Sequence, residues 1–236
     1  MYREHFQCLD QDGLLGFLRG TLRLRRPGIV ISFDDGLRDN ATVAAPLLEE
    51  SALRGWFMVP GAFLDEPEAN QPRFFRHHVR ATPNAEHPAD TPARAMSWAN
   101  ARELAGRGHV LGCHTWSHRP LGPGTPAETI AREVVDARQR LEDRLGREVR
   151  TFAWARGRVG DYSAPAHRAV ARNYDLALSS LGQAVRPNAD PHAVHRFNVE
   201  ASFAMSVVRF QVSRLNELAF AARRSAVMRA LAGESD

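Results

Sequence analysis

"GIVISFDDGLRDN", residues 28–40, contains the pattern on which the interpretation of this chain depends. The β-favouring residues of "GIVISF" predict a buried strand, which ends at two adjacent carboxylates, Asp34 and Asp35. Adjacent acids repel each other, so their position at the end of an apolar strand requires an explanation. An Asp-Gly turn is one explanation, and a positively charged group beside the carboxylates is the other.

Strand-like and helix-like segments alternate along the rest of the chain. Further strands are predicted at 54–60, 109–114, 149–155, 174–180 and 194–200, and helices at 40–53, 97–106, 125–146 and 163–173. Such alternation indicates βα units and a mainly parallel sheet or barrel. Functional groups collect at the carboxyl ends of such strands, so we expect Asp34, Asp35 and His114 at the same end of the fold.

Two of the predicted helices carry end signals. Ser97 is a candidate N-cap for the helix at 97–106. Thr125 and Glu128 form a candidate capping box at the start of the helix at 125–146, and Gly146 is its predicted end.

The composition, with 44% hydrophobic and 25% charged residues, is typical of a globular protein, and the length fits one large domain or two small ones. We expect a single domain over residues 1–236. Residues 64–96 are Pro-rich and weakly periodic, which indicates a long loop or insertion. Residues 202–232 have apolar side chains at helical spacing and predict a C-terminal helical segment.

Charge and cysteine content narrow the choice of partners and compartment. The net charge is +4 and the pI is about 9.8, which permits an anionic partner. The arginines are scattered, however, and the sequence has no long basic block of the kind that is typical of a nucleic-acid-binding protein. The two distant cysteines are compatible with a reducing compartment. No apolar run indicates a signal peptide or a transmembrane segment, so we expect a soluble, cytoplasmic protein.

A second informative stretch is "GHVLGCHTWSHRPLG", residues 108–122. His114 and His118 lie four residues apart, a spacing at which two imidazoles converge if the segment turns helically. Together with one of the two carboxylates at Asp34 and Asp35 they make a three-ligand set for zinc, iron or another divalent ion. The remaining carboxylate would then accept a proton from metal-activated water.

"ISFDDGLRDN" (31–40) and "GHVLGCHTWSHRPL" (108–121) resemble the first two motifs of the polysaccharide deacetylases, the NodB-homology or carbohydrate esterase family 4 enzymes. Those motifs usually read T-F-D-D-G and G-H-E-I-G-S-H-T-x-S-H. "LRGWFMVPG" (53–61) and "VRTFAWARGRVGDYS" (149–163) resemble later family segments more loosely. The resemblance covers residues 1 to about 200 and implies an α/β fold, a distorted (β/α) barrel of seven strands or fewer.

The resemblance also implies metal-dependent hydrolysis of an N-acetyl amide on a sugar. By motif, Asp34 is the implied general base, and Asp35, His114 and His118 are the implied ligands of a divalent metal, zinc above all. The implied substrate is an N-acetylated sugar or glycan, which the basic pI allows to be attached to a phosphate-bearing carrier.

The third motif departs from the family pattern. Ala153 stands where many members have an arginine that orients the base, and Arg156 stands where an aromatic residue is usual. Arg196, in a stretch that resembles the Leu-Pro-Arg segment of some members, is a candidate replacement for that arginine. His195 and His192 are candidates for the general acid.

Two alternatives to an N-deacetylase remain, the first implied by the chemistry of related family members and the second by these departures. One is a deformylase or another carbon–nitrogen amide hydrolase of the same fold. The other is a catalytically inactive member that binds carbohydrate. The sequence does not predict the oligomeric state.

Overall fold

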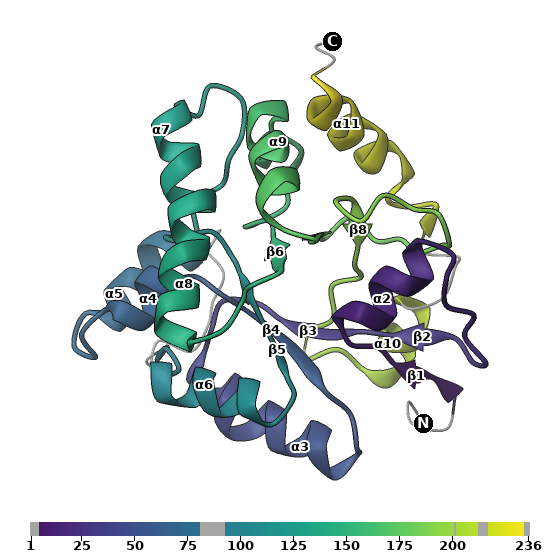
Figure 1. The fold of residues 1–236 in the computed structure, drawn as a ribbon, viewed down its shortest axis with the longest axis horizontal. Coiled ribbons are helices and arrows are strands. Elements are labelled where there is room, and N and C mark those ends of the chain that lie inside the picture. The colour runs from purple at the N-terminus through teal and green to yellow at the C-terminus, as the bar shows by residue number, and fades with distance from the viewer. Residues whose placement is uncertain (1–4, 81–92, 201, 212–216, 234–236) are drawn as a thin grey trace.

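The structure, a computed structural model, describes residues 5–80, 93–200, 202–211 and 217–233. Its centre is a curled parallel sheet of six strands, whose order in space is their order in the chain (Figure 1). The strands are β3 (Ile31–Phe33), β4 (Gly55–Val59), β5 (Val110–Cys113), β6 (Thr151–Ala153), β7 (Leu176–Ser179) and β8 (Val194–His195). The predicted α/β fold, a distorted (β/α) barrel of seven strands or fewer, is confirmed, and the six strands form a half-barrel.

The strand predicted at 28–33 is divided between two sheets. Its first part, β2 (Gly28–Ile29), pairs in parallel with β1 (Gln7–Cys8). Its second part is β3, which pairs with β4 and leads directly to Asp34.

Helices connect the strands and surround the outer face of the curled sheet (Figure 1). Parallel neighbours require such crossovers, because the chain must return to the same end before each new strand. The crossovers contain η1 (Asn40–Ala44), α3 (Ala45–Glu50), α6 (Trp98–Gly106), α7 (Ala127–Ile130), η3 (Ala131–Asp136), α8 (Ala137–Leu145), η4 (Val159–Asp161) and α9 (Ala164–Asn173).

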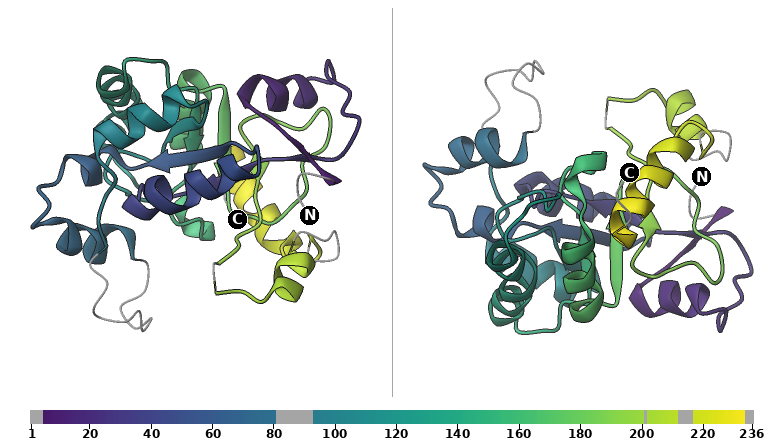
Figure 2. Two further views of the ribbon diagram at one scale, coloured as in Figure 1. Left: turned by 90° about the horizontal axis from the view of Figure 1, so that it is seen from below. Right: turned by 90° about the horizontal axis from the view of Figure 1, so that it is seen from above.

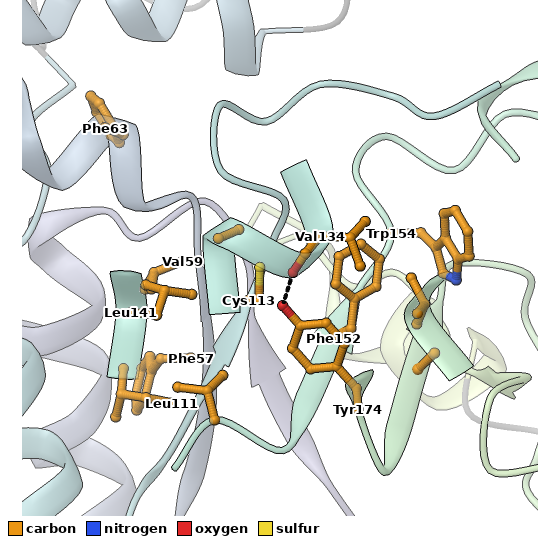
Figure 3. Close-up of a cluster of buried hydrophobic side chains, with 14 of the residues drawn as sticks. Phe57, Val59, Phe63, Leu111, Cys113, Val134, Leu141, Phe152, Trp154 and Tyr174 are labelled. Atoms are coloured by element: carbon orange, nitrogen blue, oxygen red, sulfur yellow. Dashed lines mark hydrogen bonds between the residues drawn. The ribbon is translucent and has the colours of Figure 1, made fainter. Parts of the chain in front are cut away.

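Alternate residues of the strands face two separate apolar clusters, because successive side chains of a strand point to opposite faces. The outer cluster lies between the sheet and the helices and contains Phe57, Val59, Leu111, Cys113 and Phe152 with Val134 and Leu141 (Figure 3). The inner cluster contains Trp56, Met58, Val110, Ala153, Leu176, Leu178 and Val194. The strands are therefore buried on both faces. In each strand, one set of alternate side chains points into the barrel and the other set points toward the helices.

Helix α2 (Gln11–Leu18) closes the amino end of the half-barrel. Its buried residues Leu14, Leu15 and Leu18 belong to the inner cluster. The Gln11 side chain donates to Thr151 Oγ1 at 2.7 Å, at the first residue of β6. In both views of Figure 2, α2 and the C-terminal helices lie on opposite sides of the molecule. The carboxyl ends of the strands are therefore the end that α2 leaves uncovered.

The helix ends confirm the predicted signals at Ser97 and Gly146 and correct the one at Thr125. Ser97 caps α6, and its hydroxyl accepts the Asn100 amide N–H at 3.1 Å. The predicted Thr125–Glu128 capping box was wrong, because α7 begins at Ala127 and the Thr125 hydroxyl instead donates to a carbonyl in the preceding turn. Gly146 ends α8 with a left-handed φ of 68°, as predicted.

The region predicted as a long loop contains short helices in its described part. These are α4 (Gly61–Asp65), α5 (Gln71–Phe74) and the π-helical turn η2 (Phe75–Val79), whereas residues 81–92 lie outside the described residues. The C-terminal segment contains α10 (Met205–Gln211) and α11 (Ala221–Ala232). Within the described ranges, the search for a helix with the length and apolarity of a membrane span found no candidate.

Candidate active site and metal centre

Four polar side chains emerge at the carboxyl end of the sheet. Asp34 and Asp35 follow β3, and His114 follows β5, where its backbone N–H extends the ladder by donating to the Val59 carbonyl at 3.1 Å. His118 lies four residues beyond His114. Because β3 and β5 flank β4 in a parallel sheet, the fold brings these distant segments together as the sequence predicted.

Asp35, His114 and His118 form a compact cluster. Asp35 Oδ1 lies 3.2 Å from His118 Nε2 and 3.5 Å from His114 Nε2. The three potential ligand atoms all lie within 4.8 Å of one another. The two imidazoles are buried, with side chains 2% and 4% exposed. Among the described residues, this is the group whose donor atoms are arranged to hold a metal ion.

The outer nitrogens of both imidazoles are held by backbone carbonyls. His114 Nδ1 donates to the Ala153 carbonyl at 2.9 Å, and His118 Nδ1 donates to the His78 carbonyl at 2.7 Å. Carbonyl oxygens only accept, so the proton of each neutral ring lies on Nδ1 and the lone pair lies on Nε2. Histidine ligands are held in this way in metal sites, and the donor set therefore fits a divalent cation.

The ionisable groups of the cluster influence one another strongly. Burial raises the pKa of Asp35, but hydrogen bonds from His114 and His118 outweigh burial and hold that pKa below its usual value. Burial lowers the pKa of His114, but Asp34 and Asp35 outweigh it and raise the pKa above its usual value. A bound cation would require both imidazoles to be neutral, because a ligating imidazole donates the lone pair of its unprotonated nitrogen.

The turns that carry these ligands adopt unusual backbone angles. Asp35, Thr115 and His118 have φ values of 72°, 56° and 58°. The segment from His114 to His118 is therefore not the helical turn that the spacing suggested, since left-handed residues interrupt it. Left-handed non-glycine residues cost roughly 1–3 kcal/mol each and persist only where surrounding contacts impose them.

Glu133 supplies one of those contacts. It is 1% exposed, and its two carboxylate oxygens accept the Ser117 backbone N–H and the Ser117 hydroxyl, each at 2.8 Å. Sequence reasoning missed this residue. The available signal was an acidic side chain on an apolar helix face, three residues after Ile130 and four before Ala137, both of which are buried.

Asp34 is paired with Arg196 rather than with the metal ligands. Arg196 donates Nη1 to Asp34 Oδ1 at 2.7 Å and Nη2 to Oδ2 at 2.8 Å, and Nη1 also donates to Ser32 Oγ at 2.9 Å. Burial raises the pKa of Asp34, but the Arg196 guanidinium and then His114 outweigh burial, so the pKa lies below its usual value. Asp34 Oδ2 lies 3.9 Å from His114 Nε2, at the side of the cluster.

The candidate general acids, His195 and His192, lie outside the cluster of Asp35, His114 and His118. His195 pairs with Ser179 in the sheet register, and its Nδ1 lies 2.7 Å from Ser179 Oγ. Val194 points into the barrel, so the next residue points outward, and Arg196 points inward again. Burial, followed by the charge of Arg224, lowers the pKa of His195 to about 4. His192 is also elsewhere, with Nε2 donating to the Tyr174 carbonyl at 2.9 Å.

The segment that resembles the third family motif, residues 149–163, contributes a backbone carbonyl to the site rather than an arginine side chain. Ala153 is fully buried, and its carbonyl holds His114. Arg196 therefore occupies the place beside Asp34 that the sequence comparison left without a partner. Arg156 adopts a left-handed φ of 64° at the start of the loop after β6, and its Nη2 lies 3.5 Å from the His78 carbonyl.

A comparison of the sequence with models of protein families shows to which family the chain belongs. The family model described as Polysaccharide deacetylase matches residues 22–177, which include both informative motifs. This chain belongs to the polysaccharide deacetylase family. The family prediction made from the two motifs is thus confirmed, and a comparison with curated protein sequences found no match.

Solved structures of deacetylases share the fold of this family member. The Streptococcus pyogenes deacetylase PplD, solved in complex with acetate, superposes with a TM-score of 0.69 at 16% identity, covering 89% of this chain and 81% of that one. IcaB from Ammonifex degensii gives a TM-score of 0.69 at 18% identity, covering 88% and 83%. A de-N-acetylase from Aggregatibacter actinomycetemcomitans gives 0.66 at 16% identity, covering 89% and 84%. These likenesses establish the curled parallel half-barrel.

Proposed function

We propose that this protein is a metal-dependent hydrolase that removes an N-acetyl group from an amino sugar or glycan. The observation that carries the proposal is the buried cluster of Asp35, His114 and His118, with the Arg196-paired Asp34 at its side. Family membership supports the reaction class, and the cluster provides the donor atoms that this chemistry needs.

Asp35, His114 and His118 would hold the metal ion in this proposal. Two imidazoles and one carboxylate suit zinc, which in catalytic sites commonly keeps three protein ligands and one open position. A bound zinc ion would supply a water of lowered pKa and polarise the acyl oxygen of the substrate. The carbonyls of Ala153 and His78 fix the orientation of the two rings, so the ligands are organised before the metal binds.

Asp34 would act as the general base. The Arg196 guanidinium keeps the carboxylate ionised and fixes both of its oxygens, and Ser32 extends this support. Each carboxylate oxygen retains a second lone pair, which allows Asp34 to accept a proton from the attacking water. We assign the return of that proton to the amine leaving group to Asp34 as well, because the His195 ring lies on the outer face of the sheet.

Two variants separate metal binding from proton transfer. Asp34→Asn should retain zinc and lose acetate release from an N-acetylated sugar by about 100-fold or more, since a general base contributes about 10²- to 10⁴-fold. His114→Ala should lose zinc and activity together. The exposed Asp39→Asn is the matched control and should keep both. Undiminished acetate release by Asp34→Asn, or activity that does not respond to zinc, would overturn the proposal.

A further inference from the structure

The side chain of Arg156 approaches the backbone carbonyl that orients His118 in the candidate active site. It starts in the loop after β6, and its Nη2 approaches the His78 carbonyl in η2, a segment that follows β4. Strand β5 lies between β4 and β6 in the sheet. Arg156 Nη2 and His118 Nδ1 therefore approach the same carbonyl, which places the guanidinium close to the imidazole of His118.

The Arg156 guanidinium has few partners in this position. Its Nε is buried and has no hydrogen-bond acceptor among the described residues. The contact from Nη2 to the His78 carbonyl is long, at 3.5 Å, and that carbonyl already accepts His118 Nδ1 at 2.7 Å. A guanidinium carries a permanent charge and five N–H donors. Buried donors are nearly always satisfied, so an orphaned guanidinium nitrogen points to a missing acceptor.

Other cations near His78 and His118 share this lack of acidic partners. Arg80 lies two residues after His78, and its Nε is likewise buried with no acceptor in the part of the chain that the structure describes. Arg119 directly follows His118, is exposed, and makes no ion pair with any carboxylate of the described ranges. The segments around His78 and His118 therefore carry several arginines, and Glu66 is a carboxylate that lines the same hollow as His78.

We propose that Arg156, assisted by Arg80, binds a phosphate group of the substrate next to the N-acetyl group that is hydrolysed. This inference rests on the proposed function and narrows its substrate to an anionic, phosphorylated amino sugar. A phosphate presents several acceptor oxygens that can satisfy Nε and Nη of a guanidinium in parallel, which a hydroxyl-bearing neutral sugar cannot do as strongly. Arg156 adopts this position with a left-handed φ of 64°, a conformation that carries a backbone cost for a residue other than glycine.

The test compares two substrates that differ in charge, N-acetylglucosamine 1-phosphate and methyl N-acetylglucosaminide, with zinc-loaded protein. The wild type should have the higher kcat/KM on the phosphorylated sugar. Arg156→Gln should lower kcat/KM for that sugar roughly 10- to 100-fold and leave the neutral sugar nearly unchanged, as expected for loss of charge-assisted hydrogen bonds. Arg25→Gln, which removes an equally positive exposed residue before β2, is the control and should keep the preference.

Several outcomes would overturn the inference while leaving the proposed function intact. These are an equal loss on both substrates in Arg156→Gln, no preference for the phosphorylated sugar in the wild type, or a stronger preference for the carboxylate of N-acetylmuramic acid. If zinc-loaded protein hydrolyses no N-acetyl sugar, the proposed function fails and binding of inorganic phosphate to zinc-free protein decides the inference. About tenfold weaker phosphate binding by Arg156→Gln would support it, and equal or undetectable binding by both proteins would overturn it.

Discussion

Arg196→Met should destabilise the protein by about 3 kcal/mol, because it leaves the Asp34 carboxylate without its partner. The substitution removes two charge-assisted hydrogen bonds to Asp34 and one to Ser32. Removing one member of a buried ion pair costs about 3–5 kcal/mol. The side chains of Arg196 and Asp34 are 14% and 27% exposed, which places this pair at the lower end of that range.

Urea unfolding of the zinc-free protein at neutral pH measures this cost. Introducing Asp34→Asn into Arg196→Met should recover part of the lost free energy of unfolding, since it removes the unpaired charge. The matched control is Arg38→Met, which breaks a 2.9 Å ion pair with Glu68 whose side chains are 48% and 62% exposed. Exposed pairs contribute about 0–1 kcal/mol, so Arg38→Met should have a small effect.

Two results would refute this reasoning. One is a loss of unfolding free energy in Arg196→Met no greater than that in Arg38→Met. The other is strict additivity of Arg196→Met and Asp34→Asn, because residues that contact each other should show an interaction free energy in a double-mutant cycle.

Three further predictions concern other residues. His195→Ala should change kcat by less than about threefold, whereas loss of a true general acid costs about 10²-fold or more; a loss of that size would contradict the outward placement of the ring. Glu133→Gln should weaken zinc affinity about 10-fold or more in a chelator competition, because its amide nitrogen cannot accept from Ser117. Lower thermal stability with unchanged zinc affinity would instead show a purely structural role. Asp190→Asn should destabilise the protein more at about pH 5.5 than at about pH 8 in urea unfolding. The hydrogen bond that the His192 ring donates to the Asp190 carboxylate raises the folded-state pKa of His192 above 6.5. The pair therefore stabilises the fold below that pH, and this contribution is lost as pH rises through the raised pKa; equal losses at both pH values would contradict this.

The sequence was sufficient to predict the fold and the proximity of Asp35, His114 and His118. Asp35 and His114 each follow an apolar strand, and parallel strands separated by helices place their carboxyl ends together. That argument depends only on where strands end. It does not depend on the angles of the turns, which is why it succeeded although His114 and His118 are joined by a left-handed rather than a helical segment.

The phase of the last strand could not be predicted. Strand β8 contains only Val194 and His195, and so short a stretch shows no alternation from which to decide which residue faces inward. A shift of one residue exchanges the two faces, so the sequence did not show which of His195 and Arg196 faces the barrel interior until the register with Ser179 was known.

Contacts between residues that are far apart in the sequence could also not be predicted. The Glu133 carboxylate binds Ser117 sixteen residues away, and His118 is oriented by the His78 carbonyl forty residues away. Backbone carbonyls carry no sequence signal of their own, since every residue has one. The Thr125 prediction failed because of another backbone carbonyl, this one close in sequence. The Thr125 hydroxyl donates to a carbonyl in the preceding turn.

The most direct test of the account is a zinc titration of chelator-treated protein, followed by acetate release from an N-acetylated amino sugar. Asp35, His114 and His118 form the proposed binding site, so activity should rise with added zinc and reach a plateau at one ion per chain. His118→Ala should show no rise over the same range. Acetate release that is independent of zinc, or an equal response in His118→Ala, would contradict the account.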